Sequence, residues 1–457
     1  MLLLEYANNF VISYIATSSI RLIDSRSYWP PEKTTTGAHR PYVWSGWRKY
    51  RDLLLSMNFA PFALRFCKLC PHFVALLLTI NCCSYLASAQ PHGLYLPSKL
   101  VQVMAKKDTN SWVYDLMAAH YSFIGQYKQA LTVYDLADTV KGTAMTTDLA
   151  NCTPVEARQY INRRSKKAKI IIINEAHHQP LHRVFTQSLL DSLWRNGYRY
   201  FGLEGLADGQ AVTKRGTIKL TDGFYSAEPQ FANMLRHALK LGFRLFSYEA
   251  TGKTGTARED EQASRIWGVM KAYPRDKFIV HCGFSHVTEA NHPDWGKAMA
   301  GRLKQLSGYD PFTIDQVEMS ERSQSYYEAD AFKQLKVKKA SVLVTATDSV
   351  CRISGEPHSI DVKIVHPRSS YVYDRPTWLV KDASYRYVDP SKYFKQRHFP
   401  CLVFAYKFDE NDTHVPIDII ELTNAHDVKQ LILPVGTYRL KRVYEQTVSQ
   451  LYKVVIK

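Results

Sequence analysis

The chain has 457 residues and a formal net charge of +17, with 46% hydrophobic and 22% charged residues. This composition excludes a disordered chain, and the length allows two or three globular domains. Lysine and arginine are spread along the chain instead of forming long basic runs, so we do not expect a nucleic-acid-binding protein. The positive charge would nevertheless attract an anionic ligand or membrane surface.

Residues 57–89 contain the three parts of a secretory signal peptide. Arg65 and Lys68 form a basic start, 73–80 is an apolar core, and small residues precede a cleavage site at Ala89. The apolar core is too short to span a membrane, so we expect no membrane span. We expect an exported protein that is periplasmic or extracellular after cleavage near Ala89.

The mature chain would then begin at Gln90, and residues 1–56 would be a spurious upstream extension from a start codon placed too early. The alternative is a real N-terminal domain with a buried helix that resembles a signal peptide. Export permits disulfides. Four cysteines remain after Ala89 without any C-x-x-C zinc pattern, and their pairing is left open: Cys152, Cys282, Cys351 and Cys401.

Residues 90–160 have the composition of helices, and part of them resembles a tetratricopeptide repeat. The positions that match that motif are Tyr114, Ala118, Tyr121, Gly125, Tyr127, Ala130, Tyr134 and Ala137. Small residues let two helices approach, and Gly125 turns the chain between them. Only one copy of the repeat is present, below the usual minimum for a solenoid. We therefore favour a hairpin docked on the next domain over a free peptide-binding array. A protein partner for residues 110–140 stays open.

The most informative stretch is 169–205. A β-branched run at 170–173 predicts a strand buried on both faces, and apolar residues at helical spacing follow as far as 193. A second strand is predicted at 200–203. Each strand is followed by acidic or imidazole side chains, namely Glu175, His177, His178 and Glu204. Ligands of open α/β sheets bind outside such strand ends.

Strands and helices continue to alternate as far as residue 318. The pattern predicts strands at 243–249, 277–281 and 312–317 and helices at 229–241, 258–272 and 295–306. We expect an α/β domain over 165–335, with a mostly parallel sheet covered by helices. The carboxyl ends of its strands would collect Glu175, His177, Glu204, Glu249, His281, His286 and Asp315 at one edge. We interpret Cys282 and His281 as buried core residues.

The remaining residues, 336–457, are predicted to form a β-rich C-terminal region. Segments 342–345 and 362–365 either add strands to the α/β domain or start a new one. Beyond residue 400, alternating β runs are separated by turn residues. This region is expected to be structural or binding in function.

The order of these motifs resembles the superfamily that unites ChaN-type haem-binding uptake proteins, Tiki/TraB proteins and erythromycin esterases, over residues 165–320. Its G-E-x-H segment, second acid, later G-x-x-H-V motif and Arg-Glu pair match Glu175, His177, Pro180, His182, Glu204, Gly283, His286, Arg258 and Glu259. Asn174 replaces the usual glycine. The spacing in esterase members selects His178, whereas the spacing in Tiki members selects His177.

These residues suit acid–base chemistry. Glu175, with His177 or His178, is the expected base, and Glu204 and His286 are expected to join it from other strands. Arg258 would stabilise an oxyanion or bind a substrate carboxylate. We expect a hydrolase of an ester or amide in a small-molecule or peptide ligand. The strand-end position of Glu175 predicts that Glu175→Gln hardly changes the fold.

The same residues also suit a cofactor. A divalent metal ion would be held by Glu175, His177, Glu204 and His286. The ChaN resemblance implies haem as the alternative, for which Tyr225 is a candidate axial ligand. A third hypothesis is a non-catalytic domain that only binds partners.

Overall fold

The computed structural model describes residues 95–107, 110–146, 149–293, 295–353, 359–394, 398–444, 447–448 and 451–457. The expected signal peptide at 57–89 and the upstream segment 1–56 lie outside these residues. Residues 95–249 and Glu259–Lys457 belong to one compact unit. The segment Ala250–Arg258 belongs to a second compact unit.

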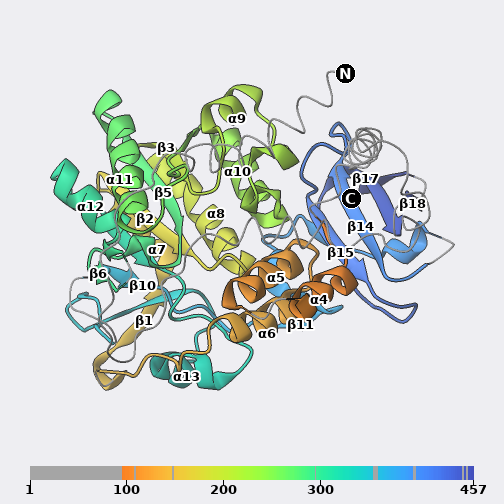
Figure 1. The fold of residues 1–457 in the computed structure, drawn as a ribbon, viewed down its shortest axis with the longest axis horizontal. Coiled ribbons are helices and arrows are strands. Elements are labelled where there is room, and N and C mark those ends of the chain that lie inside the picture. The colour runs from red at the N-terminus through yellow and green to blue at the C-terminus, as the bar shows by residue number, and fades with distance from the viewer. Residues whose placement is uncertain are drawn as a thin grey trace, which may run out of the picture. The chain divides into compact units, whose positions relative to one another are not determined.

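A six-stranded parallel sheet organises the described chain, and the expected mixed α/β class is confirmed (Figure 1). In spatial order its strands are β10 (Val362–Lys363), β8 (Phe312–Asp315), β2 (Ile170–Glu175), β5 (Lys277–Gly283), β3 (Tyr198–Leu203) and β4 (Arg244–Ser247). All neighbouring pairs are parallel.

Helices bury both faces of this sheet, which explains the continuous apolar run in β2. Ile171 and Ile173 share a core with α7 (Ala157–Ser165), α8 (Pro180–Arg195) and α10 (Pro229–Leu241). Ile170 and Ile172 face the other way, into a core with α11 (Gly255–Ala272) and α12 (Met299–Ser307). Successive side chains of a strand point to opposite faces, so a strand covered on both sides has no polar alternation.

The strand order places β5 between β2 and β3. Glu175 at the end of β2 is therefore in register with Gly283 at the end of β5. On the other side of β5, the backbone N–H of Glu204 donates to the carbonyl of His281 at 3.1 Å. Three strand ends thus meet at one point, and a glycine lies between the two acidic ends.

The segment after β5 differs from its prediction. The helix expected at 295–306 begins only at Met299. Before it, the short strands β6 (Asn291–His292) and β7 (Gly296–Lys297) form an antiparallel pair. The predicted pattern missed this pair because two-residue strands are too short for apolar periodicity.

Three helices precede the sheet: α4 (Ser98–Lys107), α5 (Ser111–Phe123) and α6 (Tyr127–Ala137). Gly125 has a φ of +74° between α5 and α6, a left-handed conformation that glycine adopts without strain. Next come the 3-10 turn η2 (Leu149–Asn151) and the strand β1 (Thr153–Glu156), which pairs with β9 (Ser341–Val344) in a separate antiparallel sheet. The segment expected at 342–345 therefore neither joins the main sheet nor begins a new domain; as β9 it pairs with β1.

Shorter helical segments connect the main elements. They are α9 (Gly209–Arg215), α13 (Asp330–Gln334), η3 (Leu220–Asp222), η4 (Tyr225–Ala227), η5 (Phe284–Val287), η6 (Ser325–Tyr327), η7 (Thr377–Leu379) and η8 (Pro390–Lys392). Two of them, η4 and η5, take part in the candidate site: Tyr225 of η4 stacks on His177, and η5 directly follows Gly283.

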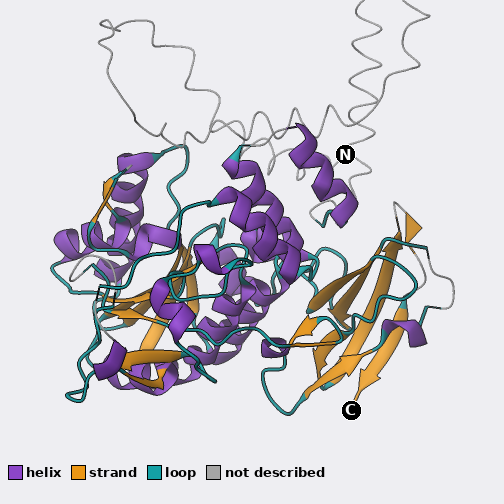
Figure 2. Ribbon diagram, turned by 90° about the horizontal axis from the view of Figure 1, so that it is seen from below, coloured by secondary structure: helices purple, strands orange, loops and turns teal. Residues whose placement is uncertain are grey.

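Small antiparallel sheets make up the C-terminal part (Figure 2). The largest contains β14 (Cys401–Lys407), β15 (Asp418–Leu422), β17 (Gly436–Tyr444), β18 (Thr447–Val448) and β19 (Tyr452–Ile456). Two further pairs are β11 (Tyr371–Val372) with β12 (Arg375–Pro376), and β13 (Tyr385–Val388) with β16 (Leu431–Pro434). The side chain of Gln126 donates to Glu421 on β15 at 2.8 Å, so this sheet also contacts the α5–α6 connection.

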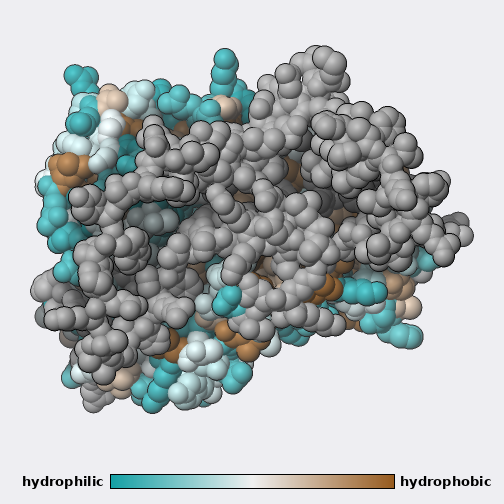
Figure 3. All heavy atoms as spheres, viewed as in Figure 1, coloured by the Kyte–Doolittle hydropathy of each residue, from teal (hydrophilic) through white to brown (hydrophobic). Residues whose placement is uncertain are grey.

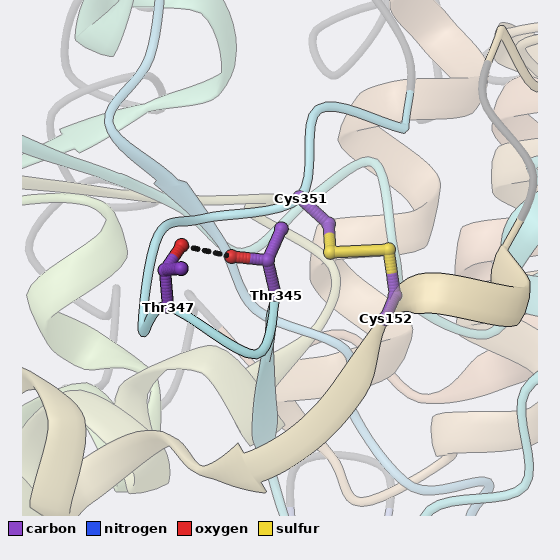
Figure 4. The surroundings of a disulfide bond; sticks show 4 residues. All are labelled: Cys152, Thr345, Thr347 and Cys351. Carbon is purple, nitrogen blue, oxygen red and sulfur yellow. Dashed lines mark hydrogen bonds between the residues drawn. A yellow bond between two sulfur atoms is a disulfide. The ribbon is translucent and has the colours of Figure 1, made fainter.

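Cys152 and Cys351 form a disulfide across 199 residues of sequence, beside the Thr345–Thr347 hydrogen bond (Figure 4). Cys282 and Cys401 are free and buried. The pairing that the sequence left open is thus between the segments next to β1 and β9. On the face in Figure 3, hydrophilic residues predominate where the surface is coloured. In the described part of the chain, no helix is long and apolar enough to cross a membrane.

Candidate functional site

The carboxylate of Glu175 is buried and bound to a buried arginine. Arg183, on α8, donates from Nε to Oε2 at 2.6 Å and from Nη2 to Oε1 at 2.7 Å. Such a bidentate pair is the strongest form of this contact. Burial acts to raise the pKa of Glu175, but the charges of Arg183 and His281 and the hydrogen bonds prevail and hold it well below its usual range. Glu175 is therefore a poor proton acceptor, contrary to its expected role as the base.

Arg183 also binds a second carboxylate. Its Nη1 donates to Oε2 of Glu228 at 3.0 Å, and both side chains are fully buried. Glu228 caps α10 by accepting the backbone N–H of Phe231 at 2.7 Å. Its other oxygen, Oε1, has no hydrogen-bond partner among the described residues. Burial raises the pKa of Glu228, which favours its neutral form beside the Arg183–Glu175 pair.

His177 extends from this pair toward the neighbouring strands. Its Nδ1 lies 3.2 Å from Oε1 of Glu175. An ionised carboxylate only accepts hydrogen bonds, so Nδ1 carries a proton, and in the neutral imidazole Nε2 is then the acceptor. The ring stacks on Tyr225 of η4 at 4.0 Å and meets the edge of Phe284 at 4.9 Å. Glu175 and the two aromatic rings thus fix the orientation of this imidazole.

Glu204 lies beside His177 across Gly283. The backbone N–H of Gly283 donates to Oε2 of Glu204 at 2.5 Å. A Cβ at position 283 would lie 2.7 Å from Nε2 of His177 and 3.4 Å from Oε2 of Glu204. A side chain at this position would therefore displace the imidazole of His177, whereas its contact with Glu204 would be an ordinary one.

His286, on η5, lies on the other side of Glu204, with Nε2 3.7 Å from Oε1. Its Nδ1 lies 2.9 Å from Oε2 of Glu259, a fully buried carboxylate on α11 that also accepts the backbone N–H of Met299. The site therefore contains two carboxylate–imidazole pairs, Glu175–His177 and Glu259–His286, on either side of Glu204.

His178 and His182, which lie close to these pairs in the sequence, make different contacts. His178 stacks on Tyr134 of α6 at 3.7 Å, and neither of its ring nitrogens has a hydrogen-bond partner among the described residues. The structure thus brings His177, and not His178, to Glu175. His182 accepts the backbone N–H of Ala176 through Nδ1 at 3.0 Å, which ties the strand end to the start of α8.

The remaining predicted members of the edge are Asp315, Glu249 and His281. Asp315 accepts from Asn174 at 2.5 Å and from the N–H groups of the turn after β8. Glu249 accepts from Gln262. His281 is buried in β5, as expected, with Nε2 3.7 Å from Oε2 of Glu175. Burial is the main cause that lowers the pKa of His281 to about 4.

Arg258 lies on α11 one residue before Glu259 and is half-buried. It belongs to the separate segment Ala250–Arg258, so its role as an oxyanion or carboxylate ligand stays a prediction. Its neighbour Glu259 has a clear place in the site, since it holds His286.

The expected metal set does not fit this geometry. In the described part of the chain, no group of three or more His, Cys, Asp or Glu side chains is arranged to hold a metal ion. Both oxygens of Glu175 bind the cation Arg183, which opposes a second cation there. The ring of Tyr225 stacks on His177 at 4.0 Å, and its role as a haem ligand stays a prediction.

Sequence patterns did not identify Arg183, Glu228 or Glu259 as partners of the site histidine and glutamate residues. Arg183 occupies a helix position three residues after Pro180, in a segment interpreted only for its apolar face. The sequence did contain one indication of its role. Arg183 lies on the apolar face of the helix, near buried positions such as Phe185, where an arginine without a partner would cost folding free energy. A buried charge on an apolar helix face predicts a buried partner.

No family model and no curated protein sequence matches the chain. Among solved structures, it is similar to the type III effector HopBA1, with 13% identity, a TM-score of 0.29, and coverage of 39% of this chain and 94% of that chain. It is also similar to RRSP, a MARTX toxin effector domain from Vibrio vulnificus CMCP6, with 17% identity, a TM-score of 0.26, and coverage of 38% and 40%. A structure described as bacterial protein toxins has 16% identity, a TM-score of 0.28, and coverage of 50% and 46%. The matched region covers less than half of the length of the last two structures. Likenesses at these scores assign neither fold nor activity.

Proposed function

We propose that the protein is an exported hydrolase of an ester or amide bond that works by acid–base chemistry. The observation that carries this proposal is the pair of carboxylate-oriented imidazoles on either side of Glu204. Each carboxylate binds Nδ1 and leaves Nε2 turned toward the centre of the site. A carboxylate that orients an imidazole in this way is the arrangement used for general base and general acid catalysis.

In this proposal His177 is the base, with its Nε2 accepting a proton from the attacking water. Glu175 does not accept that proton, because Arg183 holds it ionised and paired, and it stabilises the imidazolium that forms. Glu204 orients the water. His286 acts in its imidazolium form, and the proton on its Nε2 goes to the leaving group while Nδ1–H stays bonded to Glu259. Proton transfer by groups placed in this way contributes about 10²- to 10⁴-fold. No step uses a metal ion or haem.

Two other features support the proposal. The Cys152–Cys351 disulfide suits an exported protein, since disulfides persist in oxidising compartments. The residues of the site are those that resemble the ChaN, Tiki and erythromycin esterase superfamily, and we include that membership in the proposal. Within this superfamily, the proposed chemistry is that of its esterases and not of its haem-binding members. The small-molecule or peptide nature of the substrate stays a prediction.

The test is hydrolysis of a panel of fluorogenic esters and amides by the protein, with and without a chelator. His177→Gln and His286→Gln should each lower kcat by about 10²-fold or more at an unchanged Tm. The matched control is His426→Gln, in an exposed turn of the C-terminal part. Full activity in both site variants would refute the roles given to the imidazoles. Loss of activity with chelator alone, restored by a divalent ion, would replace acid–base chemistry with a metal mechanism.

A further inference from the structure

The residue after Gly283 has an unusual backbone conformation. Phe284 has a φ of +40°, in the left-handed region that a residue with a bulky side chain rarely adopts. Such a conformation persists only where the surrounding contacts impose it, and it occurs most often at functional sites. The ring of Phe284 meets that of His177 with ring centres 4.9 Å apart and an interplanar angle of 85°. The contacts that hold Phe284 therefore also bear on the orientation of the proposed base.

Two contacts hold the backbone and the ring of Phe284. Its carbonyl accepts a hydrogen bond from Nδ2 of Asn174 at 2.8 Å. Asn174 is itself fixed, because its Oδ1 accepts the backbone N–H of Gln316 at 2.7 Å. The ring of Phe284 is nearly parallel to that of Tyr134 on α6, with an interplanar angle of 8° and ring centres 5.9 Å apart. Asn174 thus holds the strained backbone, whereas Tyr134 packs on the ring.

Tyr134 is held in place by contacts of its own. The guanidinium of Arg322 lies 4.9 Å from the centre of its ring. The same arginine donates from Nε to Oδ1 of Asp135 at 2.8 Å, and the buried carboxylate of Asp135 also accepts the backbone N–H of Gln324 at 3.0 Å. The ring of Tyr134 further stacks on His178 at 3.7 Å. The helix α6 thus presents a fixed aromatic ring to the turn that follows β5.

We propose that Tyr134 is a positioning residue that acts through Phe284 on His177. This inference rests on the proposed hydrolase function, in which Nε2 of His177 has to face the attacking water. Tyr225 stacks on the imidazole, and Phe284 lies at a steep angle to it. Without the ring of Tyr134, Phe284 could leave its strained conformation, and the imidazole would sample more orientations. Misplacing a reacting group by about 1 Å costs up to about 10²-fold in rate.

The first arm of the test is hydrolysis by Tyr134→Leu, which keeps apolar bulk and removes the flat ring. Its kcat should fall by about tenfold or more at an unchanged KM, with activities compared at the same temperature interval below each protein's Tm. Tyr134→Phe keeps the ring and should restore most of kcat. The control Tyr309→Leu, at a tyrosine that is 41% exposed, should change neither constant. An unchanged kcat, a loss carried by KM, or an equal loss in Tyr134→Phe would overturn the proposal.

The second arm needs no turnover. NMR relaxation of the Cε1–Hε1 bond of His177, identified by the loss of its signal in His177→Gln, measures the motion of the imidazole as an order parameter. The order parameter should fall in Tyr134→Leu and keep the parent value in Tyr134→Phe and Tyr309→Leu. An unchanged order parameter in Tyr134→Leu would overturn the positioning role, whatever the hydrolysis result. A fall in Tyr134→Leu, when the parent hydrolyses no ester or amide, would leave the positioning role standing and count against the hydrolase.

Discussion

Replacing Arg183 by methionine tests the buried charge arrangement on which the site depends. Methionine keeps much of the side-chain volume over the ring of Phe231, which lies 5.2 Å from the guanidinium. The substitution removes two hydrogen bonds to Glu175 and one each to Glu228 and the carbonyl of His177. Breaking a buried ion pair by removing one partner costs about 3–5 kcal/mol of unfolding free energy, because the remaining charge stays buried.

The pH dependence of this loss identifies its cause. Without Arg183, we expect burial, the largest influence on Glu175, to prevail over the charge of His281 and the hydrogen bond of His177 and to raise the pKa of Glu175. A raised folded-state pKa means that stability is lost as pH rises through it. The difference in unfolding free energy between parent and Arg183→Met should therefore grow from pH 5 to pH 8, by up to about 1.4 kcal/mol per pH unit for each stranded carboxylate.

Urea denaturation at pH 5, 6, 7 and 8 measures this difference. The double variant Arg183→Met/Glu175→Gln should recover part of the loss, since it removes the stranded charge. Arg386→Met, at an exposed arginine, is the matched control and should cost about 0.5 kcal/mol or less. A loss below about 1 kcal/mol in Arg183→Met, or one independent of pH, would refute the inference that Glu175 is held ionised by this arginine.

Three further outcomes are expected. Gly283→Ala should abolish most hydrolysis, because its Cβ would lie 2.7 Å from Nε2 of His177. Activity is compared with that of the parent at the same temperature interval below each protein's Tm. A fully active variant would contradict the close packing of Gly283 against His177. Burial lowers the pKa of His366 to about 3, so its contribution to stability is lost as pH falls from about 6.5 toward 3. His366→Leu should therefore reduce the slope of unfolding free energy against pH by about 1.4 kcal/mol per unit over this range. The control His426→Gln, at an exposed histidine, should leave that slope unchanged. Replacing both Cys152 and Cys351 by alanine should lower the unfolding free energy by about 5 kcal/mol, because the disulfide closes a loop of 199 residues. Denaturation with and without reductant measures this loss. If reductant destabilises the double variant as much as the parent, the loss has a cause other than the disulfide.

One sequence-based expectation is corrected by the surroundings of Glu175. Its place at a strand end predicted that Glu175→Gln would hardly change the fold. The carboxylate is instead only 2% exposed and makes two hydrogen bonds to a fully buried arginine. Glu175→Gln should therefore lower stability as well as activity, and activity has to be compared at temperatures well below the Tm of the variant.

Local pattern alone determined several elements of this protein. The isoleucine run of β2 predicted a strand covered on both faces, and the helix predicted at 229–241 has the observed bounds of α10. These predictions succeed because apolar periodicity reports directly how a segment is buried. The acidic and imidazole residues at strand ends were recognised for the same reason, since parallel strands bring their carboxyl ends to one edge.

The tertiary structure alone decided which of these residues meet. The insertion of β5 between β2 and β3 places Gly283 between Glu175 and Glu204, and no local pattern encodes that strand order. The choice of His177 over His178 depends on whether a ring faces Glu175 or Tyr134, which packing of the hairpin determines. Pairings such as Arg183 with Glu228 join residues 45 apart, because such contacts depend on how helices cross the sheet and not on the sequence around either residue.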